Sequence, residues 1–485
     1  MNWKTISRNV GYALLVSALF MFIALIIAIT DREDAVIAPL SISFLLTFIF
    51  GIFPFIFVRK TAAITMREGY VIIVLSWLLS FIFGMLPYVL YGGPFNVINA
   101  WFESVSGFTT TGASILEDVE VLPRALVFWR AATHFIGGLG VVVFLLLIIP
   151  SSSPMRLRLT NMELSSLSKD SYNVRANQTV YIFSSIYLGM NLVAFVAYVL
   201  AGMVPFDAIC HSFSVCATGG FSSRNLSILS FHSLPITLVT MFFMYVASLH
   251  FGMLYVTIVT RSLKPLNNDV FKFFTGILIA GSIIVATVLK TEGVVETWSK
   301  AFLDGSFQLL SYTSTTGFAI CDNSVWPLFP ALLIMVFGIQ CGMARSTTGG
   351  VKSDRILLII KSMTVHLRRS INPSTVNEVR LNGKPLSDKD VEPHVLYVAI
   401  FFIVFAVSTL LCLASGSDNA NAIMGTLCCL DNVGPAAGTT IGSLGNYNAE
   451  PSMAKFFYTL DMFMGRVEIY PVLAVASFLF TSRKR

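Results

Sequence analysis

Long apolar segments alternate with short polar ones along almost the whole chain. A helix that crosses a bilayer needs about 20 mostly apolar residues. Ten segments have this character: 10–30, 37–58, 69–91, 123–149, 178–202, 231–260, 271–290, 327–343, 391–414 and 453–480. Between several of them lie semi-polar stretches that are too short to cross and too apolar for ordinary loops, as is typical of re-entrant segments. The pattern therefore predicts an all-α polytopic membrane protein of ten spans.

Composition supports this prediction and excludes other classes. Hydrophobic residues make up 55% of the 485 residues and charged residues only 12%, against about 25% charged in a typical soluble protein. The net charge of +6 is spread along the chain, so no nucleic-acid partner is expected. The seven cysteines form no C-x-x-C pair, and the six histidines have no ligand spacing. With no catalytic motif either, we expect no enzyme activity.

The positive charges predict the orientation of the spans. If the N-terminus is cytoplasmic, 23 of the 32 Lys and Arg residues fall in cytoplasmic segments, as the positive-inside rule requires. The C-terminus is then cytoplasmic as well. The outer segments are left with an acidic excess that would concentrate cations. The longest polar stretch, 367–390, is expected to be an exposed loop.

Four short segments share one pattern, and each ends in a glycine. These glycines are Gly112, Gly220, Gly317 and Gly434, at separations of 108, 97 and 117 residues. Six positions before them stand small residues, namely Ser106, Ser214, Ser311 and Cys428. Thirteen positions before them stand Asn99, Asp207, Asp304 and Asn421. Since Asn and Asp are common N-caps, we predict four helices of about three turns each, capped at these residues.

The C-terminal ends of these helices are the candidate functional site. A helix C-terminus carries about half a negative charge, and glycine permits the dihedral angles that turn successive carbonyls one way. Four such strands around one axis would form rings of carbonyl oxygens that replace a cation's hydration shell. The candidate filter residues are Thr110, Thr111, Gly112, Thr218, Gly219, Gly220, Thr315, Thr316, Gly317, Asn432, Val433 and Gly434. The alternative is that these are four turns at re-entrant hairpins of an unrelated transporter.

Four motifs resemble those of a known superfamily: S-G-F-T-T-T-G-A-S (106–114), A-T-G-G-F-S (217–222), T-S-T-T-G-F (313–318) and D-N-V-G-P-A-A-G (431–438). They resemble the Trk/Ktr/HKT superfamily of potassium transporters, most closely the TrkH family of pore-forming subunits. The resemblance implies four helix–pore-loop–helix repeats with pseudo-fourfold symmetry around one pore. The strands lack the T-V-G-Y-G of potassium channels, which predicts fewer binding sites and weaker discrimination of K⁺.

The resemblance also implies how the chain is divided. An N-terminal transmembrane hairpin would occupy 1–60, and the pore repeats would occupy 61–152, 153–265, 266–368 and 369–485.

The second helix of the third repeat is interrupted by glycines and small polar residues. Non-helical backbone at membrane depth is tolerated only where protein or a water-filled cavity satisfies it. We therefore favour an intramembrane gate beneath the filter, with Arg345 as a cationic obstacle, over an interfacial loop. The candidate gating residues are Gly342, Ala344, Arg345, Ser346, Thr347, Thr348, Gly349 and Gly350. The resemblance likewise implies a movable loop here.

The last predicted span holds three ionisable residues, Asp461, Arg466 and Glu468. Charges at this depth are costly and usually face a partner or a wet cavity. For Arg466 two hypotheses stand: a structural salt bridge, or a positive side chain near the pore that limits flux, as the resemblance implies. For Asp461 and Glu468 we expect structural pairing.

The resemblance implies potassium uptake across a bacterial inner membrane, with K⁺ as the transported ion. It also implies a homodimer that binds a cytoplasmic TrkA-like ring, and this ring would bind NAD or ATP. The basic segments 156–175 and 352–389 are candidate contact surfaces. No organic cofactor is expected in this chain, because Gly349–Ser353 lacks the spacing of a phosphate loop. The alternative function is secondary transport of K⁺ or another small solute coupled to H⁺ or Na⁺, which favours an inverted repeat.

Overall fold

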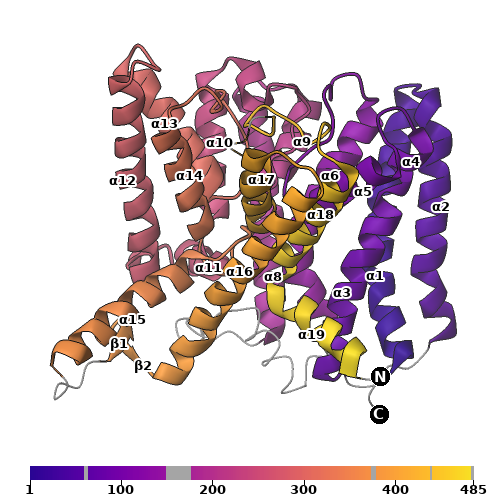
Figure 1. Cartoon of the computed structure of the whole chain (residues 1–485). Coiled ribbons are helices and arrows are strands. Elements are labelled where there is room, and N and C mark those ends of the chain that lie inside the picture. The colour runs from indigo at the N-terminus through magenta and orange to yellow at the C-terminus, as the bar shows by residue number, and fades with distance from the viewer. Residues whose placement is uncertain (59–63, 149–175, 373–377, 437, 439, 482–485) are drawn as a thin grey trace.

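The protein folds into a bundle of helices that mostly run between two opposite ends (Figure 1). The computed structural model describes residues 1–58, 64–148, 176–372, 378–436, 438 and 440–481. The long helices are α1 (Trp3–Thr30), α2 (Asp34–Phe57), α3 (Met66–Gly84), α6 (Arg124–Ile148), α8 (Ala176–Leu200), α12 (Asp269–Thr291), α15 (Ser353–Ile371) and α16 (Asp388–Ala414). The shorter elements are α4 (Leu86–Tyr91), η2 (Ser227–Phe231), α10 (Leu234–Ala247), α11 (Phe251–Thr260), η3 (Lys264–Leu266), α14 (Leu328–Gln340), α18 (Ser452–Val467) and α19 (Ile469–Thr481).

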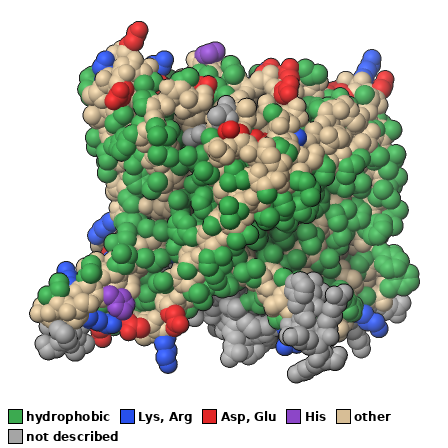
Figure 2. All heavy atoms as spheres, viewed as in Figure 1, with side chains coloured by type: hydrophobic (Ala, Val, Ile, Leu, Met, Phe, Trp, Pro, Cys, Tyr) green, Lys and Arg blue, Asp and Glu red, His purple; other side chains and the backbone are tan. Residues whose placement is uncertain are grey.

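The surface of this bundle is that of a membrane protein. Six described helices are long and apolar enough to cross a bilayer, or seven if the bent pair α10 and α11 counts as one span. Figure 2 shows hydrophobic side chains over the middle of the visible face, with charged side chains gathered toward the two ends. This distribution matches an apolar bilayer core between two polar interfaces. The N-terminal end of α1 and the C-terminal end of α19 lie at the same end of the bundle (Figure 1).

Two of the predicted spans are broken helices, so the prediction of continuous spans over 231–260 and 453–480 is wrong. The axes of α10 and α11 differ by 102°, and the carbonyl oxygen of Ser248 at this break accepts a hydrogen bond from Met343 N–H. The second break lies at Glu468, whose φ is 59°. Residues far along the chain bind the backbone or side chains at these breaks. The apolar pattern of one segment cannot reveal such partners.

The chain is not entirely helical, which corrects the all-α prediction for one segment. Strands β1 (Val379–Leu381) and β2 (Lys384–Leu386) pair in antiparallel register. Their turn, Asn382–Gly383, has φ values of 50° and 77°, and Asn-Gly is the preferred sequence for a two-residue hairpin turn. Helix α15 also extends to Ile371. The stretch 367–390, predicted to be a loop, is therefore structured over much of its length.

Four short helices stand in the upper half of the molecule as drawn in Figure 1. They are α5 (Val97–Phe108), α9 (Pro205–Cys216), α13 (Trp298–Thr313) and α17 (Asn419–Asp431). Their C-terminal ends lead into the four glycine segments, as the repeat pattern predicts. The predicted N-caps are wrong, however. Helices α5 and α17 are capped by the side chains of Asn96 and Asp418, which lie one turn earlier than the predicted residues.

The four predicted caps lie inside the helices instead, and three of them bind other parts of the chain. Asn99 Oδ1 accepts a hydrogen bond from Lys455 Nζ at 2.9 Å. Asp207 pairs with Arg224 at 2.7 Å, and Asn421 donates to Glu450 at 2.8 Å. Asp304 lies in the second turn of α13. Asn99, Asp207 and Asn421 each occupy the third position of their helix. From this position in the first turn, the side chain reaches the loops around the helix.

Candidate functional site

The four glycine segments adopt the same local conformation. We call residues 109–112, 217–220, 314–317 and 431–434 the first to fourth glycine turns. The residue two before each glycine is left-handed, with φ of 52° at Thr110, 55° at Thr218, 54° at Thr315 and 59° at Asn432. Each glycine also has positive φ: 80° at Gly112, 83° at Gly220, 77° at Gly317 and 85° at Gly434. A threonine in this region is strained, so its recurrence at three equivalent positions marks a required conformation.

Backbone hydrogen bonds explain how these turns end their helices. The N–H before each glycine bonds back to the carbonyl of the small residue identified in the repeat pattern. These bonds are Thr111 to Ser106 at 2.9 Å, Gly219 to Ser214 at 2.8 Å, Thr316 to Ser311 at 2.9 Å and Val433 to Cys428 at 2.8 Å. Together with bonds from the left-handed residues, they form the Schellman motif that closes a helix C-terminus. The chain then leaves each helix end in the same direction.

The four glycine turns pack against one another in a closed cycle. A Cβ on Gly112 would overlap the carbonyl oxygen of Gly219, and one on Gly220 would overlap that of Thr316. The cycle continues from Gly317 to Val433 O and returns from Gly434 to Thr111 O. In each pair the overlapped oxygen belongs to the residue before the next glycine. Two observations therefore require glycine at these positions: the positive φ, and the close approach of a carbonyl oxygen from the neighbouring turn.

Side-chain hydrogen bonds stabilise individual turns and link the fourth turn to the first. Thr109 and Thr111 share a hydroxyl contact of 2.8 Å, and an equivalent contact of 2.7 Å joins Ser314 and Thr316. Asn432 Nδ2 donates to Thr111 Oγ1 at 2.9 Å, which links the fourth turn to the first. The predicted filter residues are thus brought together, with their backbones packed around one centre.

A polar residue nine positions before the glycine holds the chain that follows three of the turns. Glu103 accepts a hydrogen bond from Ile115 N–H at 3.1 Å, His211 contacts Ser222 Oγ at 2.9 Å, and Gln308 Nε2 donates to Cys321 O at 2.9 Å. Sequence reasoning missed this position. The signal was present in the repeat alignment as Glu, His and Gln inside otherwise apolar helices.

A buried ion pair stands behind the first glycine turn. Glu103 and Arg130 lie 2.7 Å apart, with side-chain exposures of 0% and 2%. The guanidinium also lies 4.1 Å from the ring centroid of Phe221 and donates to Ser222 O at 3.3 Å. Because both charges are paired and hydrogen-bonded, their burial is tolerated. The pair joins the first repeat segment to the chain after the second glycine turn.

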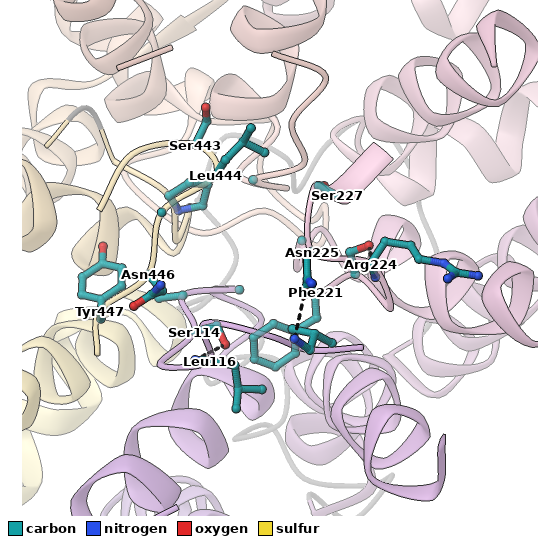
Figure 3. Close-up of a pocket in the computed structure, with 18 of the residues that line it drawn as sticks. Ser114, Leu116, Phe221, Arg224, Asn225, Ser227, Ser443, Leu444, Asn446 and Tyr447 are labelled. Atoms are coloured by element: carbon teal, nitrogen blue, oxygen red, sulfur yellow. Dashed lines mark hydrogen bonds between the residues drawn. The ribbon is translucent and has the colours of Figure 1, made fainter. Parts of the chain in front are cut away.

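A cavity of about 100 Å³ opens beside the turns. Gly112, Gly220 and Gly317 contribute to its lining, and Figure 3 shows labelled residues from several segments arranged around it. Arg224 at its edge pairs with Asp207 at 2.7 Å and with Glu120 at 3.5 Å. The hydrogen bond to Asp207 raises the pKa of Arg224. The Asn225 side chain lowers the pKa of Asp118 by donating a hydrogen bond to it. Asp118 therefore stays ionised at neutral pH and adds negative charge beside the cavity.

The predicted interruption of the helix is present as residues 341–352 between α14 and α15, here called the break segment. Gly349 N–H donates to Thr315 Oγ1 in the third glycine turn at 3.1 Å. An added Cβ on Gly350 would lie 2.9 Å from Asp431 Oδ1. Ala344 N–H donates to Asp354 at 2.6 Å, and Phe251 N–H donates to Arg345 O at 3.2 Å. Of the predicted gating residues, Gly349 and Gly350 therefore pack against the third and fourth glycine turns, whereas Ala344 and Arg345 contact the start of α15 and the start of α11.

The two membrane-depth arginines have different surroundings. Arg345 is half-buried, with φ of 62°. Arg466 is buried and donates to Thr347 O at 2.5 Å and to Gly137 O at 3.1 Å. Among the described residues no carboxylate forms an ion pair with Arg466. Within the described part of the chain, Arg466 is therefore held by backbone carbonyls and not by the hypothesised structural salt bridge.

The two acidic residues of the same region also differ. Glu468 pairs with Arg355 at 2.6 Å, which agrees with the expected structural pairing. Asp461 accepts a hydrogen bond from Ser408 Oγ of α16 at 2.5 Å, so its structural partner is a hydroxyl, and it forms no ion pair among the described residues. A third carboxylate, Asp431, was missed. It ends α17, is 1% exposed, and its Oδ1 has no hydrogen-bond partner within the described chain.

Fold and site together define a polytopic helical membrane protein in which four glycine turns pack around one centre. The family model described as "TrkH: Cation transport protein" matches residues 40–484. The chain belongs to this family. It is 30% identical over 478 residues to the Trk system potassium uptake protein TrkH of Salmonella typhimurium, which covers 98% of each chain.

Two further comparisons agree with the family assignment. The Trk system potassium uptake protein TrkG of Escherichia coli is 29% identical over 484 residues, again covering 98% of each chain. The crystal structure of the potassium transporter TrkH from Vibrio parahaemolyticus superposes with a TM-score of 0.88 at 28% identity and 98% coverage of both chains. The overall arrangement of helices is therefore shared across the full length.

Proposed function

We propose that this chain takes up potassium ions across a bacterial inner membrane through a filter formed by the four glycine turns. The observation that carries the proposal is the closed cycle in which Gly112, Gly220, Gly317 and Gly434 each meet a carbonyl of the next turn. The relatives described above are named as potassium uptake proteins or a potassium transporter. Rings of backbone carbonyls can replace the hydration shell of K⁺.

In this proposal the chain consists of an N-terminal hairpin and four pore repeats around one axis. The segments are 1–60, 61–152, 153–265, 266–368 and 369–485. Each repeat contributes one of the short helices α5, α9, α13 and α17, whose C-terminal dipole favours a cation at the turns. Support comes from the identical Schellman bonding of all four helix ends. The membrane potential drives entry, since 100 mV is worth about 2.3 kcal/mol per unit charge.

We further propose that the break segment and Arg466 gate this path from the inner side. The break segment touches the third turn through the bond from Gly349 to Thr315. Arg466 holds the same segment at Thr347, and no carboxylate of the described residues pairs with its charge. A cation leaving the filter inward would meet both the loop and the positive charge. The loop can be displaced only if the bond from Arg466 to Thr347 breaks, so one contact controls the position of both obstacles.

The regulatory assembly is part of the same proposal. We infer a homodimer that binds a cytoplasmic TrkA-like ring, with NAD or ATP bound by that ring. The Trk system names of the relatives support a multi-component arrangement. Helix α15 and the β1–β2 hairpin protrude at the end of the bundle where both chain ends lie (Figure 1). This protrusion includes much of the basic segment 352–389, a candidate contact surface. The other candidate surface, 156–175, lies outside the described residues.

The test is uptake of radiolabelled Rb⁺ by liposomes that contain only this purified chain and internal KCl. We expect external K⁺ to block uptake and Na⁺ to block it far less. A second preparation with residues 344–350 deleted should show faster uptake. Absence of uptake in both preparations would overturn the proposal. Uptake that requires an imposed H⁺ or Na⁺ gradient would instead support coupled secondary transport.

A further inference from the structure

One of the four glycine carbonyls differs from the other three. The hydroxyl of Tyr447 donates a hydrogen bond to the carbonyl oxygen of Gly434 at 2.8 Å. Within the described residues, no side chain donates to the carbonyls of Gly112, Gly220 or Gly317. The ring of carbonyls at the glycine level is therefore asymmetric, with one oxygen held from behind.

Tyr447 is fixed firmly enough to hold that oxygen in place. Its side chain is 2% exposed, and its ring lies 5.3 Å from the ring of Phe102 and 5.5 Å from that of Tyr458. Its backbone N–H donates to Ser114 O at 2.8 Å. Phe102 and Ser114 flank the first glycine turn, whereas Gly434 belongs to the fourth. Tyr447 thus stands where the cycle of four turns closes, between the fourth turn and the first, and Figure 3 shows it at the edge of the cavity beside the turns.

The chemistry of this contact bears on ion selection. A buried phenol hydroxyl needs an acceptor, but here the acceptor is a filter carbonyl rather than a side chain or a helix carbonyl. A carbonyl that accepts such a bond has a fixed orientation and less of its lone-pair density available to a passing ion. The number and field strength of coordinating carbonyls set the preference between K⁺ and Na⁺.

We propose that Tyr447 is a specificity-determining residue that positions the Gly434 carbonyl in the filter. The proposal rests on the proposed function of the glycine turns. Without the hydroxyl, the Gly434 carbonyl is free to turn, and the fourth side of the ring adapts to the smaller Na⁺. Tyr447 therefore acts through Gly434 and not as a direct ligand of the ion.

The test compares the loss of a hydroxyl at two buried tyrosines, of which one bonds to a glycine turn and the other does not. Tyr447→Phe removes only the hydroxyl that reaches the filter. Tyr458→Phe is the matched control, because the Tyr458 hydroxyl donates to Asn421 O at 3.1 Å and does not reach a glycine turn. The readout is Rb⁺ uptake into liposomes with K⁺ or Na⁺ as the external competitor. For Tyr447→Phe we expect the preference for K⁺ over Na⁺ to fall about two- to tenfold, the size of effect that one buried hydrogen bond produces.

The outcomes separate this proposal from the proposed function. Wild-type protein without K⁺-selective uptake would overturn the proposed function itself. Selective wild-type protein with an unchanged ratio in Tyr447→Phe, or an equal fall in Tyr458→Phe, would overturn only the role of Tyr447. Replacement of Tyr447 by 3-fluorotyrosine keeps the ring and strengthens the donor. It should raise the preference for K⁺, and an unchanged preference would count against the proposal even if Tyr447→Phe folds poorly.

Discussion

Arg466 donates a hydrogen bond to the carbonyl oxygen of Thr347, 2.5 Å away, although 119 positions separate the two residues in the sequence. Its second bond reaches Gly137 O at 3.1 Å. One side chain therefore joins α18, the break segment and α6. Both acceptors are neutral carbonyls, so no carboxylate among the described residues offsets the charge of the guanidinium. In the function proposed above, the same contact that holds the loop also places a barrier to cations beneath the glycine turns.

Replacing Arg466 with glutamine should raise the rate of Rb⁺ uptake by about tenfold or more, because a hydrogen bond from a charged group is worth about 1.5–3 kcal/mol. Uptake into liposomes by the purified chain measures this. Arg466→Lys serves as the control, since it keeps the charge but cannot hold both carbonyls in one planar fork. Equal uptake by wild type and Arg466→Gln would remove Arg466 from the gate.

Gly350→Ala should also raise uptake, for a steric reason. An added Cβ would overlap Cys341 Sγ and crowd Asp431, so the break segment could not keep its observed position. Gly383→Ala is the matched control. Both glycines have positive φ, 77° at Gly383 and 60° at Gly350, but an added Cβ on Gly383 would have no neighbour within 4 Å. A rise in both variants, or in neither, would contradict a specific role for the packing at Gly350.

Gly317→Ala should damage ion selectivity while the protein still inserts and folds. The added Cβ would overlap Val433 O and strain a residue with φ of 77°. Competition of K⁺ and Na⁺ against Rb⁺ uptake measures the effect, and we expect the preference for K⁺ to fall by about tenfold or more, since strain of this kind costs about 1–3 kcal/mol. Gly276→Ala on α12 has open space around it and should behave as wild type. Normal selectivity in Gly317→Ala would exclude this glycine from the filter.

Glu103→Gln should destabilise the protein by about 3–5 kcal/mol, because Arg130 would stay buried without its carboxylate. The midpoint of thermal unfolding in detergent measures this. The double variant with Arg130→Met should recover part of the loss, since no charge then remains buried. Asp31→Asn removes the exposed partner of Arg124 and should change stability by no more than about 1 kcal/mol. A similar loss in Asp31→Asn and Glu103→Gln would contradict the role of burial.

The helices and the glycine turns could be read from the sequence because their causes are local. Hydrophobic length predicts a membrane helix, and positive φ at a helix end favours glycine, as at Gly220 and Gly317. The same local logic failed at Asn99 and Asp207. An N-cap and the third helical position both suit Asn and Asp, and only the course of the preceding chain distinguishes them.

The sequence by itself determined the membrane class, the four glycine turns and the interruption after α14. Each of these follows from composition or from spacing within a short segment. Only the tertiary structure decided that Gly112 meets Gly219 O, that Arg466 holds Thr347, and that Tyr447 reaches Gly434. Contacts between distant segments depend on how whole helices pack, because a shift of a few ångströms makes or breaks a hydrogen bond. No periodicity in a single chain encodes that distance.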